Sequence, residues 1–199
     1  ASSAAVYGNV DVLPVAEDAP ARPLSPYGIH KHLGEHYLRA WSALYGLSTT
    51  ALRFFNVYGP RQDPKSPYSG VISIFIDRAT RGAPLTIFGD GAQTRDFVFV
   101  TDVVAAIVAA LFRPGATGQI FNVAGGNEVS VKALARRVID LCGDQSEIVF
   151  AEGRSGEIAR SLADTRLATD SLGFVPKVAL SEGLTQTISW FLDASENPR

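Results

Sequence analysis

Short apolar segments alternate along this chain with longer stretches of helical periodicity, and this alternation limits the fold more than any other feature. We expect strands over residues 49–55, 85–88, 95–100, 119–124 and 148–150, and helices over 27–45, 71–81, 101–112, 130–142 and from 181 onward. Alternating strands and helices are typical of α/β proteins, in which helices cover a mostly parallel sheet. The chain has 199 residues, which is enough to bury the core of one large domain or two small ones.

Capping residues define where several of these helices begin and end. Ser25 is expected to cap the first helix, Thr101 or Asp102 the third, and Ser130 the fourth, because their side-chain oxygens can accept from free N–H groups of a first turn. Gly46 is expected to end the first helix, since glycine readily adopts the left-handed conformation that follows a helix.

The charge balance and hydropathy exclude two classes of protein. The 18 Lys and Arg residues face 20 Asp and Glu, for a net charge of −2, so no basic excess exists to neutralise a nucleic-acid backbone. The longest uncharged apolar run, residues 103–112, is about half of what a membrane span needs. We therefore expect no nucleic-acid partner and no membrane association.

The sulfur-containing residues bear on compartment and chain origin. Cys142 is the only cysteine, which excludes an internal disulfide and is typical of a reducing compartment, so we expect a cytoplasmic location. No methionine occurs, even at position 1. We expect a processed chain or a segment of a longer reading frame, because residues 1–8 also read as the end of a strand with no turn before it.

Tyr27 and Lys31 lie four residues apart in the first expected helix and share one of its faces. An ammonium group beside a phenol favours the phenolate, which would make Tyr27 a general base. Taken alone this spacing is a weak signal, because most isolated matches are solvent-exposed pairs. Ser2 and Ser3 end the opening strand. A hydroxyl at such a position can face the ligand crevice of an α/β sheet, or it can simply terminate the strand.

Together these segments resemble the extended short-chain dehydrogenase/reductase family, in its branch of NAD-dependent nucleotide-sugar epimerases of the UDP-glucose 4-epimerase type. The similarity begins with Ser-x-x-Val-Tyr-Gly at residues 3–8 and Ser-Pro-Tyr-x-x-x-Lys-x-x-Gly-Glu at residues 25–35. It continues in the order of the family through residues 52–61, 87–91, 94–97, 121–123 and 154–157. The similarity therefore covers nearly the whole chain.

The resemblance implies a Ser-Tyr-Lys triad. Ser3 is similar to its hydroxyl residue, Tyr27 to its base, and Lys31 to the residue that tunes the base and holds the cofactor ribose. Phe54 would lie beside the nicotinamide of NAD.

The resemblance also implies a site for a UDP-sugar. Arg95 and Arg154 match a diphosphate clamp, for which guanidinium forks are well suited, although each alone is equally typical of a surface ion pair. Glu157 matches the acidic residue that accepts from the uridine ribose, and Ser161 lies where a small residue would leave room for an N-acetyl group. The remaining expected pocket residues are Asn56, Val71, Thr86 and Phe88.

The fold implied is the C-terminal portion of a Rossmann-like doubly wound parallel sheet with a smaller α/β substrate-binding lobe. Residues 1–60 and 95–125 would form the partial Rossmann-like domain, residues 61–94 and 126–193 the nucleotide-sugar lobe, and residues 194–199 a tail. No glycine-rich strand-turn-helix motif for the cofactor pyrophosphate occurs. NAD is therefore expected for a complete enzyme rather than for these residues alone, and a homodimer is the expected assembly.

The activity implied is epimerisation at C4 of a UDP-hexose, plain or N-acetylated. UDP-glucuronate decarboxylases and dTDP-sugar 4,6-dehydratases share the triad and remain alternatives, although they tend to carry an acidic residue where this chain has Ala4 and Ala5. A truncated, inactive UDP-sugar-binding fragment is a third reading.

One metal-site pattern competes with this interpretation. Residues 32–36 spell His-x-x-Glu-His, in which His32 and His36 would share a helix face and could bind zinc. Gly34 inside that helix is unfavourable for a rigid metal site, and the same residues continue the Tyr-Lys helix of the family pattern. We therefore expect no metal.

Overall fold

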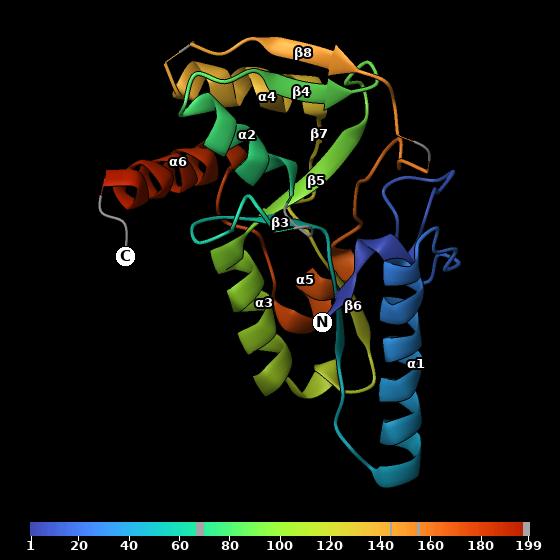
Figure 1. Ribbon diagram of the computed structural model, residues 1–199. Helices are drawn as coiled ribbons and strands as arrows, with labels where there is room; N and C mark the ends of the chain where they lie inside the picture. Colours follow the sequence, from blue (N-terminus) through green and yellow to red (C-terminus); the bar gives the residue numbers. More distant parts are fainter. Residues whose placement is uncertain (67–69, 144, 155, 197–199) are drawn as a thin grey trace.

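The computed structural model describes residues 1–66, 70–143, 145–154 and 156–196, the side chains of 194–196 excepted (Figure 1). Ser155 of the expected 154–157 motif and residues 197–199 of the expected tail lie outside the described residues. The chain has an α/β fold with parallel strand pairing, as the alternation of segments predicts.

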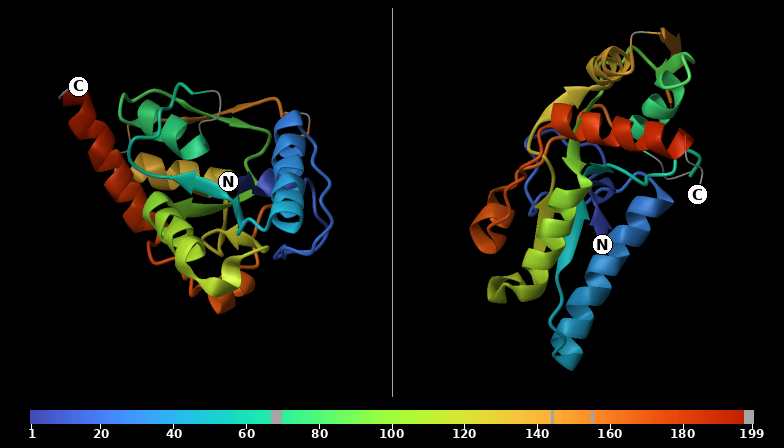
Figure 2. Two further views of the ribbon diagram at one scale, coloured as in Figure 1. Left: turned by 90° about the horizontal axis from the view of Figure 1, so that it is seen from below. Right: turned by 90° about the vertical axis from the view of Figure 1, so that its left-hand side faces the viewer.

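A parallel sheet in the order β1-β2-β6 forms the centre of one part of the fold. Its strands are β1 (Ser2–Ser3), β2 (Ala51–Phe54) and β6 (Ile120–Val123). The long helix α1 (Pro26–Tyr45) lies beside β1, while α3 (Val100–Phe112) and α5 (Arg166–Leu172) pack on the apolar side of the sheet through a shared core. Figures 1 and 2 show the N-terminus between α1 and α3.

The rest of the fold is built around a second apolar core. β3 (Asn56–Tyr58) pairs parallel with β5 (Thr94–Phe99), which pairs antiparallel with β7 (Glu128–Ser130). β4 (Leu85–Phe88) and β8 (Ile148–Ala151) form a parallel pair, covered by α2 (Val71–Ala79) and α4 (Val131–Leu141), with α6 (Leu180–Glu196) alongside (Figure 1). Two short 3-10 helices complete the chain, η1 (Ala4–Val6) and η2 (Pro114–Ala116).

The predicted ends of α1 and α4 are confirmed. Ser25 caps α1 by accepting from Gly28 N at 3.1 Å, and Gly46 ends the helix in the left-handed conformation at φ 68°. Ser130 caps α4 through a bond from Ala133 N at 3.2 Å. Because these caps satisfy N–H groups locally, the sequence itself is sufficient to locate them.

The predicted cap of α3 is wrong. The helix begins at Val100, so both Thr101 and Asp102 lie inside it, and Phe99 precedes it without a side-chain cap. The Asp102 carboxylate is buried and accepts instead from the backbone N–H groups of Lys177 and Val178, each at 3.1 Å. Asp102 therefore anchors a distant loop, which a local capping rule does not anticipate.

Several boundaries also differ from expectation. The short strands β3 and β7 and the helix α5 were not predicted, because each is brief and is stabilised by long-range pairing or packing. α6 continues to Glu196, so the expected tail of residues 194–199 begins inside a helix. Within the described part of the chain, no helix is long and apolar enough to cross a membrane.

Candidate active site

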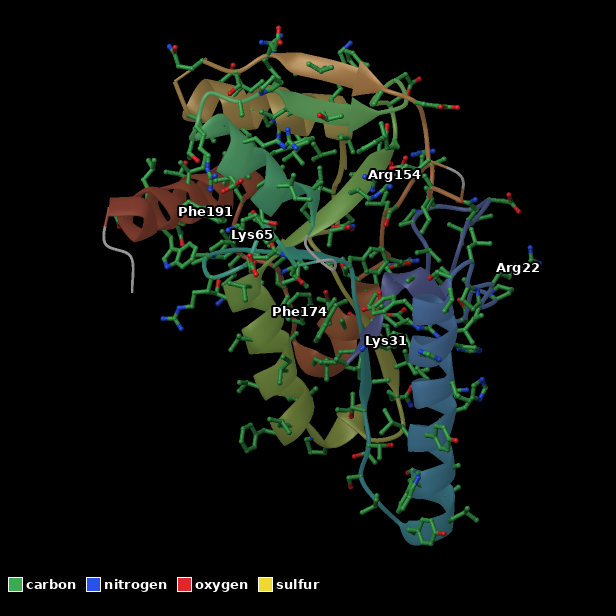
Figure 3. The ribbon with its side chains drawn as sticks, in the orientation of Figure 1. Arg22, Lys31, Lys65, Arg154, Phe174 and Phe191 are labelled. Atoms are coloured by element: carbon green, nitrogen blue, oxygen red, sulfur yellow. The ribbon has the colours of Figure 1, made fainter. Side chains whose placement is uncertain are left out.

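Three pockets adjoin at the carboxyl ends of β1 and β2, and Asn56 lines all of them. Ligands of open α/β sheets bind at this edge, beyond the ends of parallel strands. The triad pocket, about 390 Å³, is lined by Ser3, Tyr27, Lys31 and Phe54 among others. Figure 3 labels Lys31 and Arg154, which lie toward the two ends of the row of pockets.

The triad pocket brings together the residues expected to carry the chemistry. Ser3 ends β1 and begins η1, where its Oγ accepts from Ala5 N at 3.2 Å. Lys31 Nζ donates to the Ala1 carbonyl at 3.1 Å and lies 5.6 Å from the centre of the Tyr27 ring. The Tyr27 side chain is 44% exposed on the first turn of α1. A hydroxyl, a phenol and an ammonium group therefore face one solvent-accessible pocket.

The middle pocket, about 160 Å³, adjoins the triad pocket and shares Ser3, Phe54 and Asn56 with it. Arg95 and Ser161 line its far side. Among the described residues, those that line the middle and triad pockets include no aspartate or glutamate. These two pockets can therefore support proton transfer by the phenol but offer no carboxylate as a second acid or base.

The arginine pocket, about 400 Å³, contains most of the residues expected to hold a nucleotide. It is lined among others by Asn56, Val71, Thr86, Phe88, Arg95, Arg154 and Glu157. The exposed guanidinium of Arg154 stacks on the Phe88 ring, 3.7 Å from its centre. Two guanidinium groups and an aromatic face in one pocket suit an anionic nucleotide.

Arg95 is held in place by neighbours on both sides. Its Nη2 donates to Glu157 Oε1 at 3.0 Å, and its Nη1 donates to the carbonyls of Thr94 and Ile158. Burial lowers the pKa of Arg95, and the ion pair with Glu157 offsets part of that effect. An arginine keeps its charge at neutral pH, so Arg95 presents a fixed cation where the middle and arginine pockets meet.

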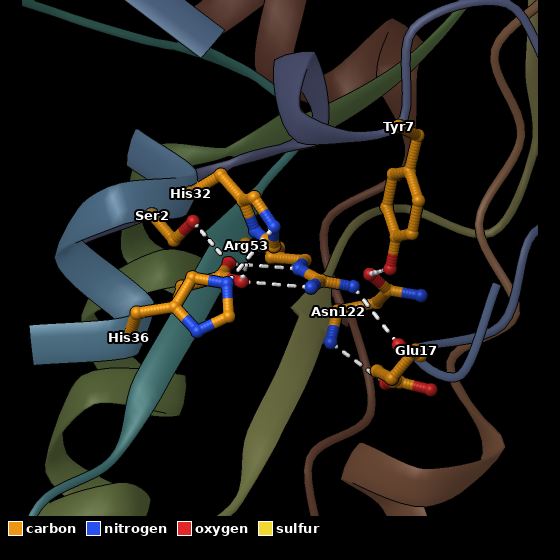
Figure 4. Close-up of polar contacts among 8 residues, drawn as sticks. Ser2, Tyr7, Glu17, His32, His36, Arg53 and Asn122 are labelled. Atoms are coloured by element: carbon orange, nitrogen blue, oxygen red, sulfur yellow. Dashed lines mark hydrogen bonds and ion pairs between the residues drawn. The ribbon is translucent and has the colours of Figure 1, made fainter. Parts of the chain in front are cut away.

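A buried polar network that the sequence did not predict lies under the triad (Figure 4). The Glu35 carboxylate accepts two bonds from Arg53, each at 2.8 Å, and one from Ser2 Oγ. Burial by itself raises the pKa of Glu35, but the hydrogen bonds from Arg53 and Ser2 outweigh it and hold that pKa below the usual range. An arginine in an apolar strand is the signal that could have revealed the network, because a buried charge requires a partner.

The network extends across the sheet to Asn122. Tyr7 donates to Asn122 Oδ1 at 2.6 Å, and its ring lies 4.7 Å from the Arg53 guanidinium carbon. Burial raises the pKa of Tyr7 to about 12, so the phenol is neutral. Tyr7 is therefore a structural hydrogen-bond donor, in contrast to the exposed Tyr27.

The His-x-x-Glu-His segment is part of this arrangement. His32 and His36 contact each other through their Nε2 atoms at 3.1 Å, and His32 Nδ1 lies 3.4 Å from Glu35 Oε2. The Glu35 carboxylate faces Arg53 inside the protein instead of the surface. Over the described residues, no group of three or more His, Cys, Asp or Glu side chains could hold a metal ion.

The residues present fit one end of a dinucleotide. Lys31 and Tyr27 offer donors for ribose hydroxyls, and the Phe54 ring lies in the same open pocket beside them. The sequence has no glycine-rich turn leading into a helix, the feature that holds a dinucleotide pyrophosphate, so the fit of these residues is limited to the nicotinamide-ribose end.

Comparison with known proteins agrees with this geometry. A model of the "NAD dependent epimerase/dehydratase family" matches residues 1–124. UDP-glucose 4-epimerase of Mycolicibacterium smegmatis is 42% identical, over 98% of this chain and 62% of that protein. dTDP-glucose 4,6-dehydratase of Streptomyces griseus is 33% identical, over 94% of this chain and 56% of that protein.

A solved structure gives the same result. The crystal structure of UDP-glucose 4-epimerase from Thermotoga maritima with UDP-glucose has a TM-score of 0.93 and 39% identity, and the match covers 98% of this chain and 62% of that one. The chain thus spans about three fifths of the length of the relatives that it matches. With its α/β fold, its pockets at the strand ends and these matches together, the chain belongs to the NAD-dependent epimerase/dehydratase family.

Proposed function

We propose that the full-length gene product containing this chain interconverts UDP-hexoses by NAD-dependent epimerisation at C4. The observation that carries the proposal is the row of adjoining pockets, with Ser3, Tyr27 and Lys31 at one end and Arg95 and Arg154 toward the other. A nucleotide sugar has the same layout, with an uncharged reacting sugar joined to an anionic diphosphate and a nucleoside.

At the triad end, Tyr27 as a phenolate takes the proton of the sugar 4-hydroxyl while Ser3 holds the oxygen by a hydrogen bond. Lys31 lies beside the Tyr27 ring and donates to ribose hydroxyls. NAD, when bound, would supply the hydride chemistry at C4, and Lys31 and Phe54 of the triad pocket would hold its nicotinamide-ribose end. Tyr27 then gives the proton back to the oxygen, so the sugar regains a hydroxyl with the opposite configuration.

At the other end, Arg95 and Arg154 hold the diphosphate, and Glu157 accepts from a ribose hydroxyl. Asn56, Val71, Thr86 and Phe88 enclose the nucleotide sugar. Firm binding here leaves the sugar free to rotate between its two faces. Ser161 is a small residue beside the middle pocket, and we expect it to leave room for an N-acetyl group.

Epimerisation is favoured over sugar dehydration and decarboxylation by the lining of the pockets. Dehydration requires an acid and a base beyond the triad, and the described residues around the middle and triad pockets supply no carboxylate. Ala4 and Ala5 line the middle pocket at the positions where an acidic residue would suit those reactions.

The test is incubation of the full-length gene product with UDP-glucose, UDP-N-acetylglucosamine, UDP-glucuronate and dTDP-glucose, followed by NMR of the sugar products. We expect C4 epimers of UDP-hexoses with no loss of water or carbon dioxide. A 4-keto-6-deoxy sugar or a pentose would overturn the proposal in favour of dehydratase or decarboxylase activity. UDP binding without turnover in protein saturated with NAD would favour an inactive binding protein.

Further proposals concern the assembly, the cofactor and the cellular location of the full-length gene product. We propose a homodimer, a nucleotide-binding lobe formed by residues 61–94 and 126–193, and a partial dinucleotide-binding domain formed by residues 1–60 and 95–125. Light scattering of the full-length gene product tests whether it is a dimer. Measurement of NAD released from the purified protein tests whether the cofactor is bound. Cell fractionation tests the proposed cytoplasmic location.

A further inference from the structure

Two rows of side chains cross the β1-β2-β6 sheet side by side. Ser2, Arg53 and Asn122 are register partners in one row, and Ser3, Phe54 and Val123 follow in the next. Neighbouring residues of a strand point to opposite faces. The first row carries the polar network, and the second carries Ser3 and Phe54 of the triad pocket, which Ser2 of the first row also borders. The network therefore adjoins the site on each of two strands.

Glu35 joins the first row to α1. Its carboxylate accepts from Ser2 Oγ and from Nε and Nη2 of Arg53. The bidentate contact with Arg53 fixes the orientation of the carboxylate as well as its distance from the strand. Glu35 and Arg53 are each 3% exposed, and Ser2 is 5% exposed. His32 Nδ1, at 3.4 Å, is a further contact of this carboxylate.

Hydrogen bonds from Lys31 Nζ to the Ala1 carbonyl and from Thr49 Oγ1 to the Leu38 carbonyl also tie α1 to its surroundings. Gly28 and Glu35 are its buried residues, and none of its large apolar side chains is buried. At Gly28 a Cβ would lie 2.5 Å from the Ala5 carbonyl oxygen, so α1 approaches η1 closely there. Tyr27 precedes this approach, and Lys31 lies one helical turn before Glu35. One anchor therefore lies next to Tyr27 and the other one helical turn beyond Lys31.

We propose that Glu35 is a positioning residue, which through Arg53 and Ser2 sets the separation of Tyr27 and Lys31 from Ser3 and Phe54. The proposal rests on the proposed function, since it assigns Glu35 a role in that reaction. Glu35 lies outside the residues that line the three pockets, so it acts through its neighbours.

The test compares Glu35→Gln and Arg53→Lys with the unsubstituted full-length gene product. Glu35→Gln removes the negative charge and keeps the length of the side chain. Arg53→Lys keeps the positive charge but cannot form the two parallel hydrogen bonds of a guanidinium group. Asp77→Asn is the matched control, because it breaks a carboxylate-arginine pair with Arg81, and Asp77 lines none of the three pockets. Each protein is measured for kcat, KM, UDP binding by calorimetry and the isotope effect of a substrate deuterated at C4.

We expect kcat to fall by about 10- to 100-fold in both variants, because a shift of about 1 Å in reacting groups has that effect. KM and the UDP dissociation constant should stay within twofold, since UDP binds at the other end of the row. The isotope effect should rise, because hydrogen transfer from C4 becomes more rate-limiting. Asp77→Asn should change none of these.

Two outcomes would overturn the positioning role. The first is unchanged kcat in both variants. The second is a fall in kcat matched by an equal loss of UDP-binding sites, with an unchanged isotope effect, since this is the behaviour of a smaller folded fraction.

Failure of the proposed function gives a different result. In that case the unsubstituted protein itself interconverts no UDP-hexose. The positioning role is then decided by crystal structures of the full-length gene product and its Glu35→Gln variant: a changed distance from Ser3 Oγ to Tyr27 Oη supports the role, and an unchanged distance rejects it.

Discussion

The helices α1 and α4 are held in the fold by opposite means. α4 buries the apolar stripe of Val131, Leu134, Ala135, Val138 and Ile139, whereas the buried residues of the longer α1 are Gly28 and Glu35. Large apolar side chains of α1 lie exposed instead, among them Ile29, Tyr37 and Trp41. The helix that borders the arginine pocket is thus fixed by apolar packing, and the helix that carries Tyr27 is fixed by hydrogen bonds and charge.

This difference has consequences for how each end responds to change. Apolar packing loses free energy in proportion to the atoms removed and is insensitive to pH. A buried ion pair fails sharply when one partner is lost, because the other charge stays buried without compensation. The two ends of the row of pockets should therefore be separable by mutation.

Tyr27→Phe should have the largest effect. Loss of a general base typically lowers kcat by about 10²- to 10⁴-fold. Since the Tyr27 side chain is 44% exposed, the melting temperature should change by no more than about 2 °C. Steady-state kinetics and thermal unfolding of the full-length gene product test this. Retention of more than a tenth of the activity would show that another group moves the proton.

Arg53→Leu should be the most destabilising single change on the α1 side. It leaves the Glu35 carboxylate buried without its partner, which typically costs about 3–5 kcal/mol of unfolding free energy. Urea denaturation measures the loss. The double variant Arg53→Leu/Glu35→Leu should recover much of it, because no charge then remains buried. A loss below about 1 kcal/mol in the single variant would mean that the pair does not anchor α1.

Leu134→Ala is the corresponding change in α4. Leu134 is fully buried in the larger core, so its truncation should cost about 2–5 kcal/mol. The loss should be independent of pH between 5 and 8, as measured by urea denaturation at several pH values. This core consists of hydrophobic residues, so a strong dependence on pH would contradict the contrast between the two helices.

The smallest expected effect is on acid stability. Because the folded-state pKa of Glu35 lies below its usual range, its contribution to stability is complete above the unfolded pKa of about 4.3 and is lost as pH falls further. The groups that face the Glu35 carboxylate are Arg53, which stays charged, and His32. Glu35→Gln should therefore lose less stability than the unsubstituted protein below pH of about 4.3, in urea titrations that use Asp77→Asn as control. Parallel curves for Glu35→Gln and the unsubstituted protein would contradict the assignment.

Much of the fold could be predicted because the relevant signals are local. Caps at Ser25 and Ser130 and the left-handed Gly46 depend on neighbouring atoms only. The prediction that Asp102 could cap its own helix was wrong for the opposite reason, since its carboxylate accepts from the backbone N–H groups of Lys177 and Val178 far along the chain. Brief elements such as β7 gain their stability from partners in β5 that periodicity does not reveal.

The site was predictable to the extent that side chains alone indicate chemistry. Spacing placed Tyr27 and Lys31 on one face, and the structure brings Ser3 to the same pocket. The pairing of Glu35 with Arg53 could not be read in the same way, because it joins a helix to a strand 18 residues later. Only the general requirement that a buried charge be paired pointed toward it.

The most direct test of the account is a calorimetric titration of UDP into the full-length gene product and its Arg154→Gln and Tyr27→Phe variants, with kcat measured on the same samples. The account predicts that Arg154→Gln weakens UDP binding by about tenfold or more, since charged hydrogen bonds contribute about 1.5–3 kcal/mol, while kcat changes little. Tyr27→Phe should leave UDP binding unchanged and remove activity. Equal effects of both variants on binding and on kcat would contradict the separation of nucleotide binding from chemistry.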